Sequence, residues 1–229
     1  MKKTNKTFYK KAIINFGMYP QTIKDNNVTI SGTPDENGYY TGSDGEKYEM
    51  LKANPFDDNY LFSNGETIIE NKEYYFKVEK IKWQVLDVTE KEILLFSKQI
   101  LDAHVFDSKS NIYKYASIRK WLNENFYNVA FSNQEKKQML PTLVDEEYDK
   151  VFLLSSEEIA SSSYGFSSLT REKKPTDYAK ANYAFSFIEN GNGNYWLRSI
   201  NKISQEGICY VDYTGYANCN LVPFGVNGV

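Results

Sequence analysis

The sequence predicts an α+β fold, because strand patterns come first, helical patterns follow and strand patterns return. Tyr74, Phe76 and Val78 alternate with polar residues, which is typical of a half-buried strand. Residues 117–139 carry helical spacing, and residues 195–229 hold short apolar runs separated by Gly and Asn. Since no strand–helix–strand alternation occurs, we expect an antiparallel central sheet with packed helices and long irregular loops.

Length and charge limit the function classes. A chain of 229 residues with 41% hydrophobic residues can bury a core, and we expect one domain over residues 1–229. The net charge of −3 argues against nucleic acid as a partner. No apolar run is long enough for a membrane span. The basic start at residues 1–6 lacks the apolar stretch of an export signal, so the cytoplasm is the default location and an extracellular one stays open.

The first quarter of the chain reads as a strand followed by a turn-rich lobe. Residues 12–20 resemble a strand that Pro20 ends. Residues 23–73 are rich in Gly, Pro and Asn, with short strands expected at 28–30 and 39–41. We therefore expect a lobe of β-hairpins over residues 23–73.

Three strands are expected next, at 74–78, 83–88 and 93–97. The last two are almost continuously apolar and flank a polar loop. Continuous apolar character indicates burial on both faces, so residues 74–98 should form the central sheet together with the C-terminal strands.

The middle of the chain predicts helices with clear start signals. Ser117 is the expected N-cap of a helix over residues 118–129. Its apolar stripe contains Ile118, Trp121, Leu122, Phe126 and Val129. Further starts are expected at Ser132, Ser155 and Thr176, and Pro141 should end the helix that Ser132 opens.

Short strands are expected to return at 195–199, 208–213 and 216–221. Cys209 and Cys219 could then face each other across a hairpin. A disulfide and two reduced thiols both fit this spacing, because cross-strand disulfide geometry is restrictive. We expect reduced, partly buried thiols.

The C-terminal region from 195 to 229 also carries the candidate binding residues. Tyrosine gives a large rigid contact area, and asparagine adds adaptable hydrogen bonds. Period-two spacing places alternate members on one face of a hairpin. A general Tyr/Asn bias in composition would produce the same pattern without function. The candidate ligand-binding residues are Tyr195, Asn201, Tyr210, Asp212, Tyr213, Tyr216, Asn218 and Asn220.

Enzyme and metal signatures are weak. His104 is the only histidine and has no nucleophile motif beside it, so a polar loop residue is expected. The run Asn190–Asn194 resembles the start of a calcium loop but lacks its glycine and final glutamate. The acidic runs 145–147 and 157–158 look solvated. We expect no catalytic residue, metal or cofactor. Four residues are expected to be structural: Trp121, Arg119, Trp196 and Arg198.

Taken in order, several segments resemble a family of uncharacterised bacterial domains. They include Phe16-Gly-Met-Tyr-Pro-Gln21, Lys82-Trp-Gln-Val-Leu86, Ser117-Ile-Arg-Lys-Trp-Leu-Asn123, Asp177-Tyr-Ala179 and Trp196-Leu-Arg-Ser199. That family is similar to the C-type lectin-like fold in its formylglycine-generating-enzyme variety. The resemblance implies a scaffold whose C-terminal hairpins display variable residues, and retroelement-driven diversification of residues 194–227 is compatible with it. It also implies that Arg-Pro would follow Val229.

The enzymatic relatives do not transfer their activity, because their cysteine pair is spaced more closely than Cys209 and Cys219. We therefore expect a non-enzymatic module that binds a protein or a glycan through its C-terminal hairpin surface. A carboxylate-based hydrolase or modifying enzyme, with a cleft beside Trp196 and Arg198, is the first alternative. The second alternative is a structural domain of a bacterial surface assembly, which would contact its neighbours through residues 23–73.

Overall fold

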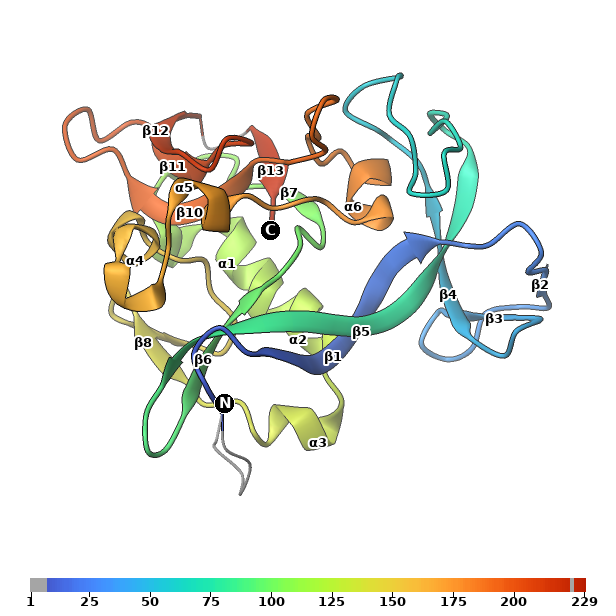
Figure 1. Cartoon of the computed structure of the whole chain (residues 1–229), viewed down its shortest axis with the longest axis horizontal. Coiled ribbons are helices and arrows are strands. Elements are labelled where there is room, and N and C mark those ends of the chain that lie inside the picture. Colours follow the sequence, from blue (N-terminus) through green and yellow to red (C-terminus); the bar gives the residue numbers. More distant parts are fainter. Residues whose placement is uncertain (1–7, 223–224) are drawn as a thin grey trace.

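The structure is a computed structural model that describes residues 8–222 and 225–229. The basic start at residues 1–6 lies outside this part. The fold is α+β, with most strands in antiparallel sheets and only short helices (Figure 1). The strands are β1 Ile13–Ile23, β2 Ile30–Ser31, β3 Tyr40–Gly42, β4 Lys47–Lys52, β5 Glu73–Val88, β6 Ile93–Ser97, β7 Ala103–Val105, β8 Thr142–Val144, β9 Glu147–Asp149, β10 Tyr195–Ile200, β11 Ile208–Val211, β12 Ala217–Leu221 and β13 Val226–Gly228. The helices are α1 Ser117–Trp121, α2 Tyr127–Ala130, α3 Asn133–Lys136, α4 Ser156–Ala160, α5 Ser168–Arg171 and α6 Asp177–Ala181, with the single turns η1 Tyr113–Tyr115, η2 Leu122–Phe126 and η3 Ser162–Tyr164.

The first sheet is built around the long strand β5, in the order β1-β5-β4-β3-β2, with β6 also paired to β5. The first part of β5 pairs with β4 and its last part pairs with β6. The sequence predicted two strands here, but β5 runs through both because it pairs with β1 from Phe76 to Gln84. The alternation shifts by one residue between them, since Lys80 is exposed and Ile81 is fully buried. The strands β2, β3 and β4 form hairpins in the turn-rich lobe.

Pro20 does not end the first strand, contrary to expectation, and β1 continues to Ile23. The strand lies at the edge of its sheet, and its register with β5 shifts between Pro20 and Thr22. An edge position or a bulge tolerates proline because the missing N–H is not needed by the ladder there.

The predicted helix 118–129 is observed as α1, the π-helical turn η2 and α2. Ile118, Leu122 and Phe126 are buried as predicted, whereas Val129 is exposed, so the stripe is narrower than expected. Ser117 is not the N-cap: Ala116 takes that place without a side-chain cap. The Ser117 N–H is instead bound by the Asp107 carboxylate at 2.7 Å.

The other three helix starts are confirmed. Ser132 and Ser155 each form a capping box with the glutamate three residues later. Thr176 accepts a hydrogen bond from the Ala179 N–H at the start of α6. The helix α3 ends well before Pro141.

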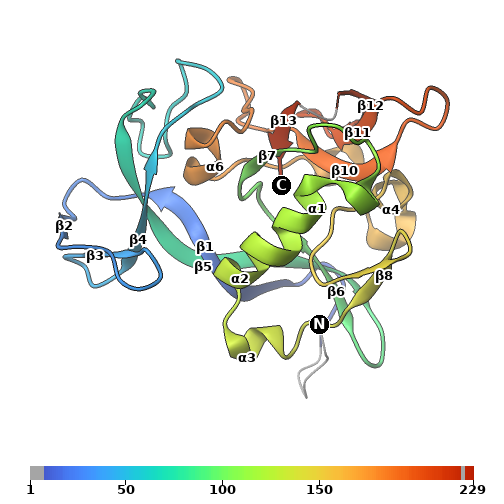
Figure 2. The same ribbon diagram turned by 180° about the vertical axis from the view of Figure 1, so that it is seen from behind.

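The C-terminal strands form a second sheet, in the order β12-β11-β10-β13-β7, and do not join residues 74–98 as expected. Both edges of β10 are occupied, by β11 and β13, so no strand of the first sheet pairs with it. Figure 2 shows α1 and α2 between the two sheets. A single cluster of buried side chains joins Phe76 of β5, Phe126 of η2 and Trp196 of β10, which places the core there.

Cys209 and Cys219 form a disulfide, so the expectation of reduced thiols is wrong. They lie on the antiparallel strands β11 and β12, whose register shifts between Ile208 and Tyr210. The register of the pairs Val211–Ala217 and Tyr210–Asn218 continues to Cys209 and Cys219 and places them opposite each other, as the spacing in the sequence allowed.

Candidate functional site

The eight candidate binding residues do not form one exposed face. Tyr195 is only 5% exposed, and its hydroxyl donates to the Arg171 carbonyl at 2.9 Å. Burial raises the pKa of Tyr195 far above its usual range. The expectation that its ring meets solvent is wrong, because the ring projects into a cluster of buried side chains and contacts the ring of Phe96 on β6.

Three more of the polar candidates are engaged in turns. Asp212 accepts hydrogen bonds from the backbone of Thr214 and Tyr216 and from the Asn218 amide. Asn201 donates to the Cys219 carbonyl and accepts from two backbone N–H groups of its own loop. These side chains hold the hairpins in shape, so they contribute to a surface mainly by fixing its geometry.

The remaining candidates differ in exposure. Tyr210 is half-buried and packs on the core, whereas Tyr216 is 65% exposed and Asn220 is also exposed. The turn before Tyr216 passes close to α5: a Cβ on Gly215 would lie 1.9 Å from the Ser168 carbonyl oxygen. Glycine is therefore required at this approach, where φ is +79°.

Tyr213 belongs to a chain of aromatic rings that we call the aromatic ridge, defined as Phe56, Tyr183, Phe185, Phe187 and Tyr213. The Phe56 ring lies 5.5 Å from that of Tyr183 and 5.4 Å from that of Phe185. Tyr213 lies 5.9 Å from Phe185 and stacks on Phe187 at 4.3 Å. Phe56 and Tyr183 are exposed and the other three rings are half-buried.

The ridge follows the loop between α6 and β10, which lies between the turn-rich lobe and the C-terminal sheet in both views (Figures 1 and 2). Tyr183, Phe185 and Phe187 alternate with Ala184 and Ser186, and it is these two small residues that are buried. The large aromatic rings therefore point outward where core packing would place them inward.

The Asn-Gly run fixes this loop to the C-terminal hairpin. The Asn192 amide donates to the Tyr213 carbonyl at 3.2 Å and to Glu172 at 2.8 Å. The Asn194 side chain accepts from the Tyr213 N–H at 2.9 Å. The asparagines thus position Tyr213 at the ridge.

Within the described residues no cluster of His, Cys, Asp and Glu could hold a metal ion.

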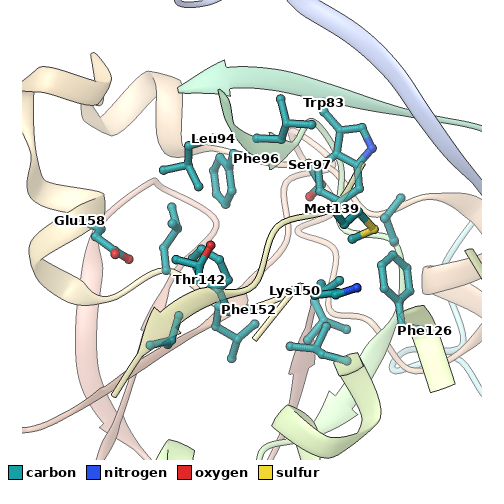
Figure 3. A pocket seen from close by; sticks show the side chains of 18 of the residues that line it. Trp83, Leu94, Phe96, Ser97, Phe126, Met139, Thr142, Lys150, Phe152 and Glu158 are labelled. Atoms are coloured by element: carbon teal, nitrogen blue, oxygen red, sulfur yellow. The ribbon is translucent and has the colours of Figure 1, made fainter. Parts of the chain in front are cut away.

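A second feature is a cavity of about 360 Å³, partly open to solvent, that we call the internal cavity. Side chains from β6, from residues 139–144 and from residues 150–152 converge around it (Figure 3). Its lining is mainly apolar, with Leu94, Phe96, Met139 and Phe152 among the residues labelled in the figure. Such a volume is in the range of small-molecule sites.

Two carboxylates at the cavity have structural partners. Glu158 receives two hydrogen bonds from the Arg198 guanidinium, at 2.6 and 2.9 Å. Asp102 receives hydrogen bonds from the Tyr19 hydroxyl and the Asn182 amide, both at 2.6 Å. Carboxylates fixed in this way are poorly placed for the hydrolase alternative, which requires a free acid and a free base near Trp196.

The other residues expected to be structural make the following contacts. Arg119 binds Asp149 through two hydrogen bonds, at 2.8 and 2.7 Å. Trp196 is 1% exposed and its indole donates to the His104 carbonyl. His104 lies on β7 rather than in a loop, with its ring 3.9 Å from that of Trp121.

Sequence reasoning missed Phe56, Phe185 and Phe187 as surface residues. A signal was present, because Tyr183, Phe185 and Phe187 alternate with small residues in a segment without other strand features. The contact of Phe56 with this segment depends on the pairing of Asn54 with Asn182, which only the structure reveals. The cavity also has no signature in the sequence.

Comparison with known proteins gives a family but no characterised relative. No curated protein and no solved structure matches the chain. Within the described residues no helix has both the length and the apolar character that a membrane span needs. The family model described as "Domain of unknown function (DUF6273)" matches residues 90–229, which include β10 to β13 and most of the cavity wall. With more than half of its length matched, the chain belongs to the DUF6273 family.

Proposed function

We propose that the chain is a non-enzymatic binding module that recognises a protein partner through the aromatic ridge and the adjoining turn of the β11–β12 hairpin. Of the eight candidate binding residues, the proposed surface keeps Tyr213 and Tyr216. It adds four rings from outside the hairpin: Phe56, Tyr183, Phe185 and Phe187. A C-type lectin-like scaffold is part of the proposal, and it rests on the order of the sequence motifs.

One observation carries the proposal. In the segment 183–187 Tyr183 is exposed and Phe185 and Phe187 are half-buried, while the small residues Ala184 and Ser186 are buried. Exposing rings costs free energy that burying them would regain, about 25 cal/mol per Å² of apolar surface. A contiguous exposed apolar patch on a folded protein is typical of an interaction site.

The shape and surroundings of the ridge favour a protein over a glycan. Its rings contact one another in four pairs, of which two are edge-to-face, one is tilted and one is stacked, so their orientations are fixed before binding. Exposed Ile188 extends the apolar surface beside Phe187, and Asn and Asp side chains surround Tyr213. An apolar aromatic centre with a polar rim is the usual arrangement of protein interfaces.

The proposal is tested by comparing two double variants of similar chemistry. Phe56→Ser with Tyr183→Asn removes exposed rings from the ridge. Leu143→Ser with Tyr148→Ser removes exposed apolar side chains from the β8–β9 hairpin, on another side of the molecule (Figures 1 and 2). Each protein is immobilised and incubated with a lysate of the source cells, and retained proteins are quantified by mass spectrometry.

The expected result is a partner that the wild type and the β8–β9 variant retain and that the ridge variant loses at least tenfold. Equal retention by all three proteins would contradict the proposal. It would favour contact through the turn-rich lobe if deleting a loop within residues 23–53, which excludes Phe56, abolished retention. The same three proteins are also applied to a glycan array, which tests whether the ligand is a glycan. If the wild type binds a glycan and the ridge variant does not, the ligand is a glycan and the proposal of a protein partner is wrong.

A further inference from the structure

Lys173 is a buried amine beside the internal cavity. The residue is only 6% exposed, and it lines the cavity described above. Its Nζ donates to the carbonyl of Ser97 and, at 3.2 Å, to the Ser97 hydroxyl. The nitrogen lies 3.3 Å from the centre of the Phe96 ring. Across residues 8–222 and 225–229, no carboxylate forms an ion pair with it.

The charged groups near this amine do not stabilise its protonated form. Lys98, which follows β6, carries the same charge. The uncharged rings of Phe96 and Tyr195, at 3.3 and 5.4 Å, attract a cation, but they add no opposite charge. Burial, and then the charge of Lys98, lower the pKa of Lys173 well below its usual range. A neutral lysine amine is a nucleophile, which the ammonium form is not.

The backbone holds Lys173 firmly in this place. The Gly193 N–H donates to the Lys173 carbonyl at 2.7 Å, and the Ile100 N–H donates to the carbonyl of the next residue at 3.1 Å. A Cβ on Gly193 would lie 2.5 Å from the Phe185 carbonyl oxygen, so this crossing requires a glycine. The side chain is therefore directed from a fixed backbone, as a reactive group requires.

We propose that Lys173 is a reactive amine that forms an imine with apolar aldehydes entering the cavity. The nitrogen lone pair attacks the carbonyl carbon and forms a C–N bond. The carbonyl oxygen then leaves as water, taking with it the two protons that the neutral amine carried. No oxidant or reductant is required. The apolar lining selects for an apolar tail, and the volume of about 360 Å³ admits a small molecule. This site is independent of the aromatic ridge.

The test uses the wild-type protein, hexanal as the probe and cyanoborohydride to trap the imine as a stable secondary amine. Peptide mass spectrometry then measures labelling at each lysine between pH 7 and pH 9. We expect Lys173 to be labelled at least tenfold faster than Lys98 and Lys174 at pH 7. Its rate should change little with pH, whereas the rates of exposed lysines should rise about tenfold per pH unit.

Two controls link the reactivity to the fold. In concentrated urea, Lys173 should be labelled no faster than Lys98 and Lys174, because the fold that buries its amine is lost. Hexan-1-ol, which fits the same cavity but has no carbonyl group, should slow labelling of Lys173 alone. If Lys173 in the folded protein reacts no faster than its neighbours at pH 7, or shows the same steep rise with pH, the proposal is overturned. Loss of labelling in Lys173→Arg, but not in Lys174→Arg, would confirm the assignment of the peptide signal.

Discussion

The aromatic ridge and the internal cavity are both lined by aromatic rings, but they use them in opposite ways. On the ridge, Tyr183 and Phe56 expose their rings while small residues between them are buried. In the cavity, Phe96 and Tyr195 line a partly open space beside a buried amine. The ridge can therefore meet a macromolecule, whereas the cavity can only take up a small one. The number of tyrosines in the sequence does not distinguish these two uses, because the residues packed around each ring determine whether it is exposed or buried.

The largest expected effect separates two tyrosines from the same predicted set. Tyr195→Ala should lower the free energy of unfolding by about 3 kcal/mol, because it empties a buried site. Tyr216→Ala should change it by no more than about 0.5 kcal/mol, because the ring is mostly exposed. Urea denaturation monitored by circular dichroism measures both. Similar losses in the two variants would contradict the distinction between interior and surface.

The disulfide should have the next largest effect. Replacing Cys209 and Cys219 by alanine opens a closed loop with a sequence separation of 10 residues. Loop-closure entropy predicts a loss of about 2–3 kcal/mol. The loss should appear equally when the wild type is unfolded in a reducing agent. If reduction has no effect on the urea midpoint, the disulfide does not stabilise the hairpin that presents Tyr216.

Lys173 gives a pH-dependent effect that sharpens the description of the cavity. Its pKa is lowered in the folded state, so the unfolded chain binds more protons and wild-type stability falls as pH decreases from about 10. Lys173→Met removes this loss of stability, which amounts to about 1.4 kcal/mol for each unit by which the pKa is lowered. As the pH falls from 9 to 6, the free energy of unfolding of the variant should therefore rise relative to that of the wild type. A stability difference that stays constant over this range would show that the amine is not buried as described.

The smallest stability effect is expected on the ridge. Tyr183 adopts a φ of +74°, a region that asparagine tolerates better than most residues. Tyr183→Asn should therefore leave the free energy of unfolding within about 0.5 kcal/mol of the wild type. A loss of more than about 2 kcal/mol in urea denaturation would mean that the ring supports the fold, and would weaken its assignment to recognition.

Local patterns predicted local structure well. The caps at Ser132, Ser155 and Thr176 are present, because a cap depends on residues three positions apart. The α+β class also follows from the order of the segments. The division into two sheets could not be predicted, because it depends on which strands lie along the edges of β10.

The candidate site was predicted only in part for the same reason. Tyr213 and Tyr216 lie at the proposed surface, but the ring of Tyr195 is buried against Phe96, which is about a hundred residues away in the sequence. The contribution of Phe56 depends on contact with a segment more than a hundred residues away. The spacing of Cys209 and Cys219 allowed a disulfide, but its formation depends on cross-strand geometry, which the spacing does not determine.

The most direct measurement is a footprint of the partner on the protein. Carbene labelling of side chains, with and without the partner that the wild type retains, reports which surfaces become covered. The account predicts protection of Phe56, Tyr183, Tyr213 and Tyr216, with no change at Leu143 and Tyr148. Protection confined to residues 23–53 or to the β8–β9 hairpin, with the ridge still labelled, would contradict it.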